Sequence, residues 1–321
     1  MASADHGNKI RIGVSSCLLG NEVRFDGGHK RNDFVADIFG KFVEFVPVCP
    51  EVEIGMGTPR ESIALRRLDG DVRLLGNKTS SDHTVKMTSY ADKRTRSLGA
   101  EDLSGYILKK DSPSCGMERV RVYAENGMPS RDGIGMFASA LMRRYPNLPV
   151  EEEGRLKDPK LRENFVERVF AYRRMQNFFA TRWTQGALIA FHTAHKLVLL
   201  AHSPNAYREL GRYVAEAKQI PRTEFREEYE TRFMSALKKL ATPPRHVNVM
   251  QHMLGYFREH LEESARRELA ELVDDYARGL VPLIVPLTLI RHYVRRFEVD
   301  YLSGQVYLNP HPKELMLLNH V

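Results

Sequence analysis

The sequence predicts an α/β domain with a parallel sheet, followed by an all-α domain, on three observations. At 321 residues the chain is about twice as long as a typical domain. Up to about residue 150, short apolar runs alternate with glycine-rich turns, as they do where strands lead into helices. After Pro149, apolar residues recur at helical spacing instead.

Three strands and one helix are the clearest elements of the first half. Strands are predicted at residues 9–16, 42–48 and 104–109, which are short apolar runs bounded by turn signals. A helix is predicted at residues 134–145, because this segment has an apolar face and Pro146 stops it.

The second half is expected to contain five to seven helices. Helical periodicity is clear in residues 161–175, 224–240 and 247–276, and proline or glycine turn signals separate these segments. Residues 147–158, which include three consecutive glutamates, interrupt the pattern and are predicted to be a linker. We therefore expect domains at residues 1–155 and 156–321.

The overall composition is that of a soluble globular protein, with 42% hydrophobic and 28% charged residues. The most apolar window, residues 280–290, contains two prolines and is too short to span a membrane, so we expect a cytoplasmic protein. The 48 basic and 41 acidic residues give a net charge of +7. This balance suits a polyanionic partner, although it is also common in proteins that bind no nucleic acid.

The three cysteines each follow a predicted strand. Cys17 closes the first strand, Cys49 follows the second, and Cys115 follows the third after a short loop. Because the carboxyl ends of parallel strands meet at one edge of a sheet, the three thiols should converge on one pocket. A single cysteine is more often a small buried hydrophobe, but three at equivalent positions favour a shared ligand. Their odd number argues against a disulfide framework.

Three thiolates could hold either zinc or an iron-sulfur cluster. Structural zinc takes four ligands, usually with closely spaced cysteine pairs, and the sequence has no Cys-x-x-Cys. Catalytic zinc with three cysteines and an open position remains an alternative. A cubane cluster on three cysteines would leave one iron free, and a soft sulfur atom of a substrate would suit that iron.

Two segments beside the cysteines offer groups for proton transfer. Ser112 and Ser114 lie in a hydroxyl-rich turn with Cys115, or simply in a Ser-Pro turn before a helix. Glu51 follows Cys49 by two residues and could act as a general acid if burial raised its pKa. The plainer interpretation of Glu51 is an exposed acidic residue at a helix start.

The segment between the first two cysteines has the residues of a substrate-binding loop. Arg24, Asp26 and Lys30 offer donors and an acceptor for a polar ring. Gly27 and Gly28 allow the backbone to approach a ligand closely.

Together these segments resemble the thiouracil desulfurases of the TudS type, over about residues 8–155. The resemblance rests on the segments Cys17-Leu18-Leu19-Gly20, Val23-Arg24-Phe25-Asp26-Gly27-Gly28, Cys49-Pro50-Glu51 and Ser112-Pro113-Ser114-Cys115-Gly116. It implies a Rossmann-like domain with a 4Fe-4S cluster on the three cysteines. It also implies that the free iron takes the thiocarbonyl sulfur, that Glu51 and Ser112 or Ser114 assist, and that uracil leaves without net redox change.

From about residue 160 to 321 the chain resembles the helical YbgA-type domain that is often fused behind this catalytic domain. The resemblance lies in residues 192–196, 246–252, 281–287 and 301–312. Fused forms look like desulfidases acting on 4-thiouridine, with tRNA as its natural source.

Two sets of side chains in the second half are candidates for binding. Arginines interleaved with aromatic residues could contact the phosphates and bases of tRNA, or equally form a solvated face over an aromatic core. This set comprises Arg173, Arg174, Arg182, Arg291, Arg295 and Arg296 with Phe178, Phe179, Trp183 and Tyr293. Four histidines could bind a metal, but core or surface positions are favoured because no acidic or cysteine companions are evident: His192, His195, His246 and His252.

The leading hypothesis is therefore a cluster-dependent desulfidase, hydrolytic or lyase-like. Its substrate would be a small thiopyrimidine or thionucleoside (2- or 4-thiouracil, or 4-thiouridine, free or in tRNA), and its products uracil or uridine and sulfide. The alternatives are a non-catalytic RNA-binding or redox-sensing iron-sulfur protein, and a zinc hydrolase on the same three cysteines.

Overall fold

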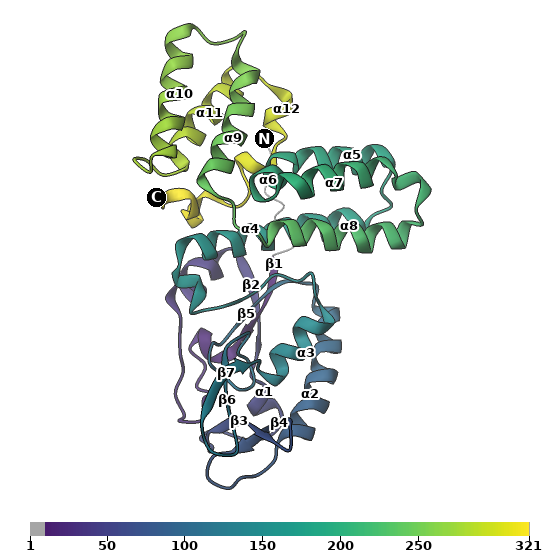
Figure 1. The fold of residues 1–321 in the computed structure, drawn as a ribbon, viewed down its shortest axis with the longest axis vertical. Coiled ribbons are helices and arrows are strands. Elements are labelled where there is room, and N and C mark those ends of the chain that lie inside the picture. Colours follow the sequence, from purple (N-terminus) through teal and green to yellow (C-terminus); the bar gives the residue numbers. More distant parts are fainter. Residues whose placement is uncertain (1–9, 321) are drawn as a thin grey trace. The chain divides into compact units, whose positions relative to one another are not determined.

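The computed structural model describes residues 10–320 (Figure 1). The chain divides between Lys157 and Asp158 into two compact units. The first unit is α/β, and no strand occurs in the second among residues 158–320. The predicted fold class is confirmed.

The central sheet of the first unit has four parallel strands in the order β2-β1-β5-β8. The strands are β1 (Ile10–Ser15), β2 (Val43–Val48), β5 (Leu103–Leu108) and β8 (Val150–Glu152). The first three confirm the predicted strands to within a residue, except that residue 9 lies outside the described residues. All six residues of β5 are buried, as is typical of a parallel strand that is covered on both faces.

The fourth strand, β8, lies where the sequence analysis predicted a linker, so that prediction was wrong for this segment. β8 pairs with β5 from Tyr106 and Val150 to Leu108 and Glu152. The acidic residues misled the prediction because their carboxylates are buried but satisfied. Glu152 accepts a hydrogen bond from the Met117 N–H at 2.7 Å, and burial of polar groups is tolerated when they are bonded in this way.

Close packing against glycine holds the two central strands together. A Cβ atom at Gly13 in β1 would lie 2.1 Å from a ring carbon of Tyr106 in β5, so only glycine fits here. Tyr106 is fully buried, and its ring also packs against Phe137 of α3.

A second, mixed sheet and two helices complete the first unit. The sheet has the order β4-β3-β6-β7 and comprises β3 (Ile63–Leu68), β4 (Asp71–Gly76), β6 (Val120–Tyr123) and β7 (Pro129–Gly133). Helices α2 (Thr84–Ser97) and α3 (Met136–Arg144) pack side by side (Figure 1). The second sheet was not predicted, whereas α3 matches the helix predicted at residues 134–145.

The second unit contains nine α-helices among residues 158–320, more than the five to seven expected. They are α4 (Pro159–Ala180), α5 (Gln185–Ala194), α6 (Lys196–His202), α7 (Pro204–Ala215), α8 (Arg222–Leu237), α9 (Pro243–Leu254), α10 (Glu263–Ala277), α11 (Ile284–Arg296) and α12 (Asp300–Ser303). The periodic segment 247–276 is two helices, because α9 ends at Leu254. Asp158 caps α4 by accepting from the Lys160 N–H at 2.8 Å.

Three of the aromatic residues proposed to contact nucleic-acid bases lie in the core of the helical unit. Phe179, Trp183 and Tyr293 are buried, at 6%, 9% and 7% exposure. Their rings therefore cannot stack on nucleic-acid bases, and the aromatic-core alternative is the correct one for these residues. None of the helices in the part of the chain that the structure describes is long and apolar enough to cross a membrane.

Candidate active site at the carboxyl ends of the parallel strands

The three cysteines line one cavity of about 390 Å³ at the carboxyl ends of β1, β2 and β5. Cys17 lies in a 3₁₀ turn directly after β1, and Cys49 is the N-cap of the short helix α1 (Pro50–Glu53) after β2. Cys115 lies in the turn that follows β5, and all three thiols are free. The structure thus brings together the three residues that the sequence analysis selected as metal ligands.

Burial makes ionisation of these thiols costly. It raises the pKa of Cys17 to about 11, although Lys109 opposes the shift. Burial likewise raises the pKa values of Cys49 and Cys115, and the nearby Glu51 adds to both shifts. A bound metal centre would supply the positive charge that stabilises thiolates, so the energetics of these sites suit metal ligands.

The turn around Cys115 is fixed by its own serines. Ser112 Oγ accepts hydrogen bonds from the backbone N–H groups of Ser114 (3.2 Å) and Cys115 (3.1 Å). Gly116 is needed because a Cβ there would lie 2.9 Å from the Ser112 carbonyl oxygen. Ser112 lines the cavity, whereas Ser114 does not and is fully buried.

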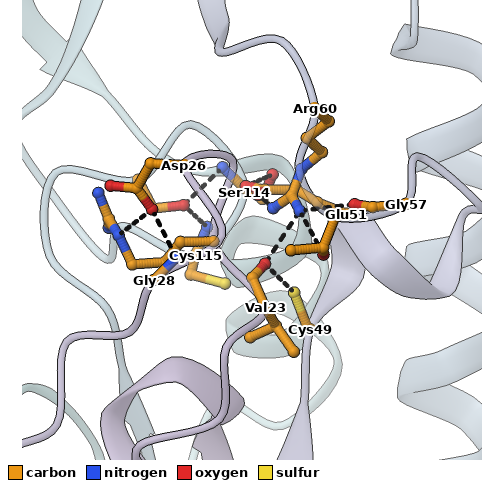
Figure 2. Close-up of polar contacts among 12 residues, drawn as sticks. Val23, Asp26, Gly28, Cys49, Glu51, Gly57, Arg60, Ser114 and Cys115 are labelled. Atoms are coloured by element: carbon orange, nitrogen blue, oxygen red, sulfur yellow. Dashed lines mark hydrogen bonds and ion pairs between the residues drawn. The ribbon is translucent and has the colours of Figure 1, made fainter.

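Glu51 is held from two sides at the cavity wall. Ser114 Oγ donates to Glu51 Oε1 at 2.9 Å, and the Arg60 guanidinium forms an ion pair with Glu51 Oε2 (Figure 2). The Arg60 side chain is 4% exposed and also donates to the carbonyl oxygens of Val23 and Gly57, each at 2.9 Å. Charge-assisted bonds of this kind fix both the position and the orientation of a carboxylate.

Arg60 was missed by the sequence analysis, although it lies on the cavity wall. The only feature of the sequence that could have pointed to Arg60 is its position in the turn Gly57-Thr58-Pro59-Arg60, nine residues after Glu51. A glycine- and proline-containing turn is common, however, and the sequence alone does not reveal which acidic residue an arginine meets.

The proposed substrate loop contributes to the cavity in two different ways. Arg24 and Lys30 line the cavity, whereas Asp26, Gly27 and Gly28 do not. Asp26 Oδ1 accepts from the Gly28 N–H at 3.1 Å and lies 3.4 Å from Arg24 Nε. Gly27 has a φ of +78°, which favours glycine. The three residues form a turn that supports Arg24.

The three free cysteines form a set of soft donors at the cavity. Among residues 10–320, no three His, Cys, Asp or Glu side chains are arranged to hold one metal ion. Thiolates are soft ligands, and such a set would suit an iron-sulfur cluster or a zinc ion. Cys17, Cys49 and Cys115 would supply the thiolates, because their three free thiols line one cavity of about 390 Å³.

The histidines singled out in the second half do not form a common site. His192 Nδ1 lies 3.1 Å from the Tyr229 hydroxyl, and His195 Nδ1 donates to the Phe191 carbonyl at 2.8 Å. Burial lowers the pKa of His192 to about 4 and that of His195 to about 3. Both are therefore core residues with neutral imidazole rings. His252 is exposed.

Comparisons with known proteins agree with this division of the chain. The family model described as "2-thiouracil desulfurase" matches residues 12–153, and the model described as "Protein of unknown function (DUF1722)" matches residues 196–312. "Uncharacterized protein YbgA" of Escherichia coli (strain K12) is 38% identical over 151 residues, which cover 47% of this chain and 89% of that protein.

Two further proteins are similar to the chain. "Uncharacterized protein YbbK" of Bacillus subtilis (strain 168) is 32% identical over 151 residues, covering 45% of this chain and 97% of that protein. A solved structure described as "[4Fe-4S]-dependent thiouracil desulfidase TudS" is 29% identical, covers 47% of this chain and 95% of its own, and gives a TM-score of 0.38. The chain therefore belongs to the 2-thiouracil desulfurase family through its first unit and to the DUF1722 family, with YbgA, through its second.

Proposed function

We propose that this protein is a desulfidase that replaces the sulfur of a thiolated pyrimidine with oxygen from water. The thiocarbonyl carbon loses sulfur as hydrogen sulfide and gains the oxygen of one water molecule, so no electrons are transferred. The observation that carries the proposal is the convergence of three free cysteines and Glu51 on one cavity. Membership of residues 12–153 in the 2-thiouracil desulfurase family supports it.

We assign a 4Fe-4S cluster to Cys17, Cys49 and Cys115. When bound by three thiolates, such a cluster offers one iron without a protein ligand, and a soft thiocarbonyl sulfur suits that iron. Zinc on the same thiolates is the competing assignment. The two differ in colour, since a cluster absorbs visible light and zinc does not.

The remaining side chains bind the substrate and transfer protons. Glu51 relays a proton: it takes one from the incoming water and returns it to the departing sulfur, while Ser114 and Arg60 hold its carboxylate in place. Ser112 lines the cavity and can donate to the pyrimidine.

The loop before β2 supplies the contacts to the ring. Arg24 and Lys30 lie at the cavity and can donate to its oxygen atoms. Asp26, Gly27 and Gly28 position Arg24 through the turn that they form.

Replacement of a cluster ligand tests the cofactor assignment. Cys115→Ser should lose both bound iron and desulfurase activity, because two remaining thiolates hold a cubane poorly. Iron content and visible absorbance of the anaerobically purified protein measure the first effect, and sulfide release measures the second. Wild-type iron content and turnover in this variant would contradict the assignment, and a colourless wild-type protein containing zinc would favour the hydrolase alternative.

Replacement of the proposed proton relay should separate chemistry from cluster binding. Glu51→Gln keeps the shape of the side chain, so iron content should stay at the wild-type level while kcat falls by about 100-fold to 10,000-fold. Glu22→Gln is the matched control, because Glu22 is exposed in the loop that follows β1 and does not line the cavity. Equal rates for the two variants would remove Glu51 from the mechanism.

We further propose 4-thiouridine, including 4-thiouridine in tRNA, as a substrate. The exposed arginines of the helical unit support this proposal, but fewer of the arginines are exposed than the sequence suggested. Arg173 is buried, and Arg291 Nε donates to the Leu308 carbonyl at 2.6 Å. Arg182, Arg295 and Arg296 are exposed and remain available for phosphates.

Charge reversal at α11 tests tRNA binding. Arg295→Glu with Arg296→Glu should weaken tRNA binding at low salt, and binding by the wild-type protein should fall steeply as salt rises, because phosphate contacts release counterions. Turnover of the free nucleoside should not change. The same reversal at Arg266 and Arg267, two exposed arginines of α10, controls for net charge. If tRNA affinity, measured by fluorescence anisotropy, responds to neither salt nor the α11 variant, the helical unit does not bind tRNA through this surface.

A further inference from the structure

The helical unit contains a cavity of its own, of about 300 Å³, to which the proposed function gives no role. α4, the start of α9 and the end of α10 contribute to its wall, together with residues 281 and 283 and His320. Its volume is at the lower end of the range for small-molecule sites. Its apolar lining includes Leu240, Ala241, Pro243, Val281 and Leu283.

The cavity is also lined by two carboxyl groups one helical turn apart on α4, Glu163 and Glu167. Glu167 already has a partner, because His202 Nε2 lies 2.9 Å from its Oε2. The other ring nitrogen of His202 donates to the Lys239 carbonyl. Although burial opposes it, the Glu167 carboxylate raises the pKa of His202, so this pair is a buried salt bridge.

Glu163 has no comparable partner. His320 Nδ1 lies 3.4 Å from its Oε2, and that N–H donates to the Leu317 carbonyl at 2.8 Å. Burial, and secondarily the charge of Glu167, raises the pKa of Glu163 to about 8. The carboxyl therefore keeps its proton near neutral pH, and a cation bound beside it would stabilise the ionised form.

The other titratable groups at the cavity do not supply that cation. Arg278 is exposed and pairs with Asp275 at 2.9 Å, and burial lowers the pKa of His246 to about 4. Lys160 also lines the cavity but is exposed to solvent. The charged and titratable groups that line the cavity are Lys160, Glu163, Glu167, His202, His246, Tyr276, Arg278 and His320.

We propose that this cavity binds a small organic cation, a protonated amine on an apolar body. The ammonium group donates to the Glu163 carboxylate, and the apolar body packs against the wall that includes Leu240 and Leu283. A metal ion fits less well, because Glu167 and His202 are already paired and no three candidate ligands in the described part of the unit are arranged around one ion. The inference does not depend on the desulfidase proposal.

Binding of benzylamine to the full-length protein tests the inference by calorimetry. Benzylamine should bind saturably, and benzyl alcohol, its neutral counterpart, at least tenfold more weakly. Glu163→Gln should weaken benzylamine binding by about 10-fold to 100-fold, the usual range for losing a charge-assisted bond. Glu224→Gln, at an exposed position of α8, should bind benzylamine as the wild type does.

The pH dependence gives a second test that needs no variant. The amine binds the ionised carboxylate, so below the pKa of about 8 a proton must leave Glu163 on binding. Affinity should therefore rise about tenfold per pH unit from pH 6 towards 8 and then level off, and Glu163→Gln should lack this rise.

Two results would overturn the inference: no binding of benzylamine, or equal binding of the amine and the alcohol. Binding of Zn²⁺ that Glu163→Gln abolishes, in place of benzylamine binding, would identify a metal site instead. If Glu163→Gln does not fold, as judged by circular dichroism, the comparison of amine with alcohol and the pH profile in the wild-type protein still decide.

Discussion

The parallel pairing of β1 with β2 and β5 is the constraint on which the candidate site depends. Because the three strands run in the same direction, their carboxyl ends lie at one edge of the sheet, and each is followed by a cysteine. The register pairs Ser15 with Val48, so Cys17 and Cys49 leave the sheet at nearly the same level. Gly13 lets the Tyr106 ring lie against β1. Without this pairing the three thiols would not share a cavity.

The site buries several ionisable groups, and the energetic cost of burial is offset to a different degree for each. Arg60 and Glu51 pair with each other, and each has further hydrogen bonds, so their burial is largely offset. At the thiols burial outweighs the few polar contacts, so they resist ionisation, as the raised pKa of Cys17 shows. The protein thus holds three thiols where a metal centre would relieve their electrostatic cost. In the helical unit, burial likewise disfavours ionisation of Glu163, which lines a different cavity.

Local patterns in the sequence predicted the features that depend on neighbouring residues. Apolar runs located β1, β2 and β5, and the positions of the cysteines after them predicted one shared pocket. Features that depend on distant partners were not predictable in this way. β8 was missed because its glutamates are satisfied by groups outside the strand, such as the Met117 N–H. Arg60 was missed because only the fold shows that it meets Glu51, and the pairing of Glu167 with His202 is hidden for the same reason.

The central claim is that water replaces sulfur in a thiopyrimidine without net electron transfer. The most direct measurement uses the anaerobically purified protein with 4-thiouridine in water labelled with heavy oxygen (¹⁸O). The account predicts equal amounts of sulfide and uridine, one labelled oxygen at the former thiocarbonyl carbon, and no requirement for an added oxidant or reductant. An iron-loaded protein that releases no sulfide, or one that forms uridine only when a redox partner is consumed, would contradict it.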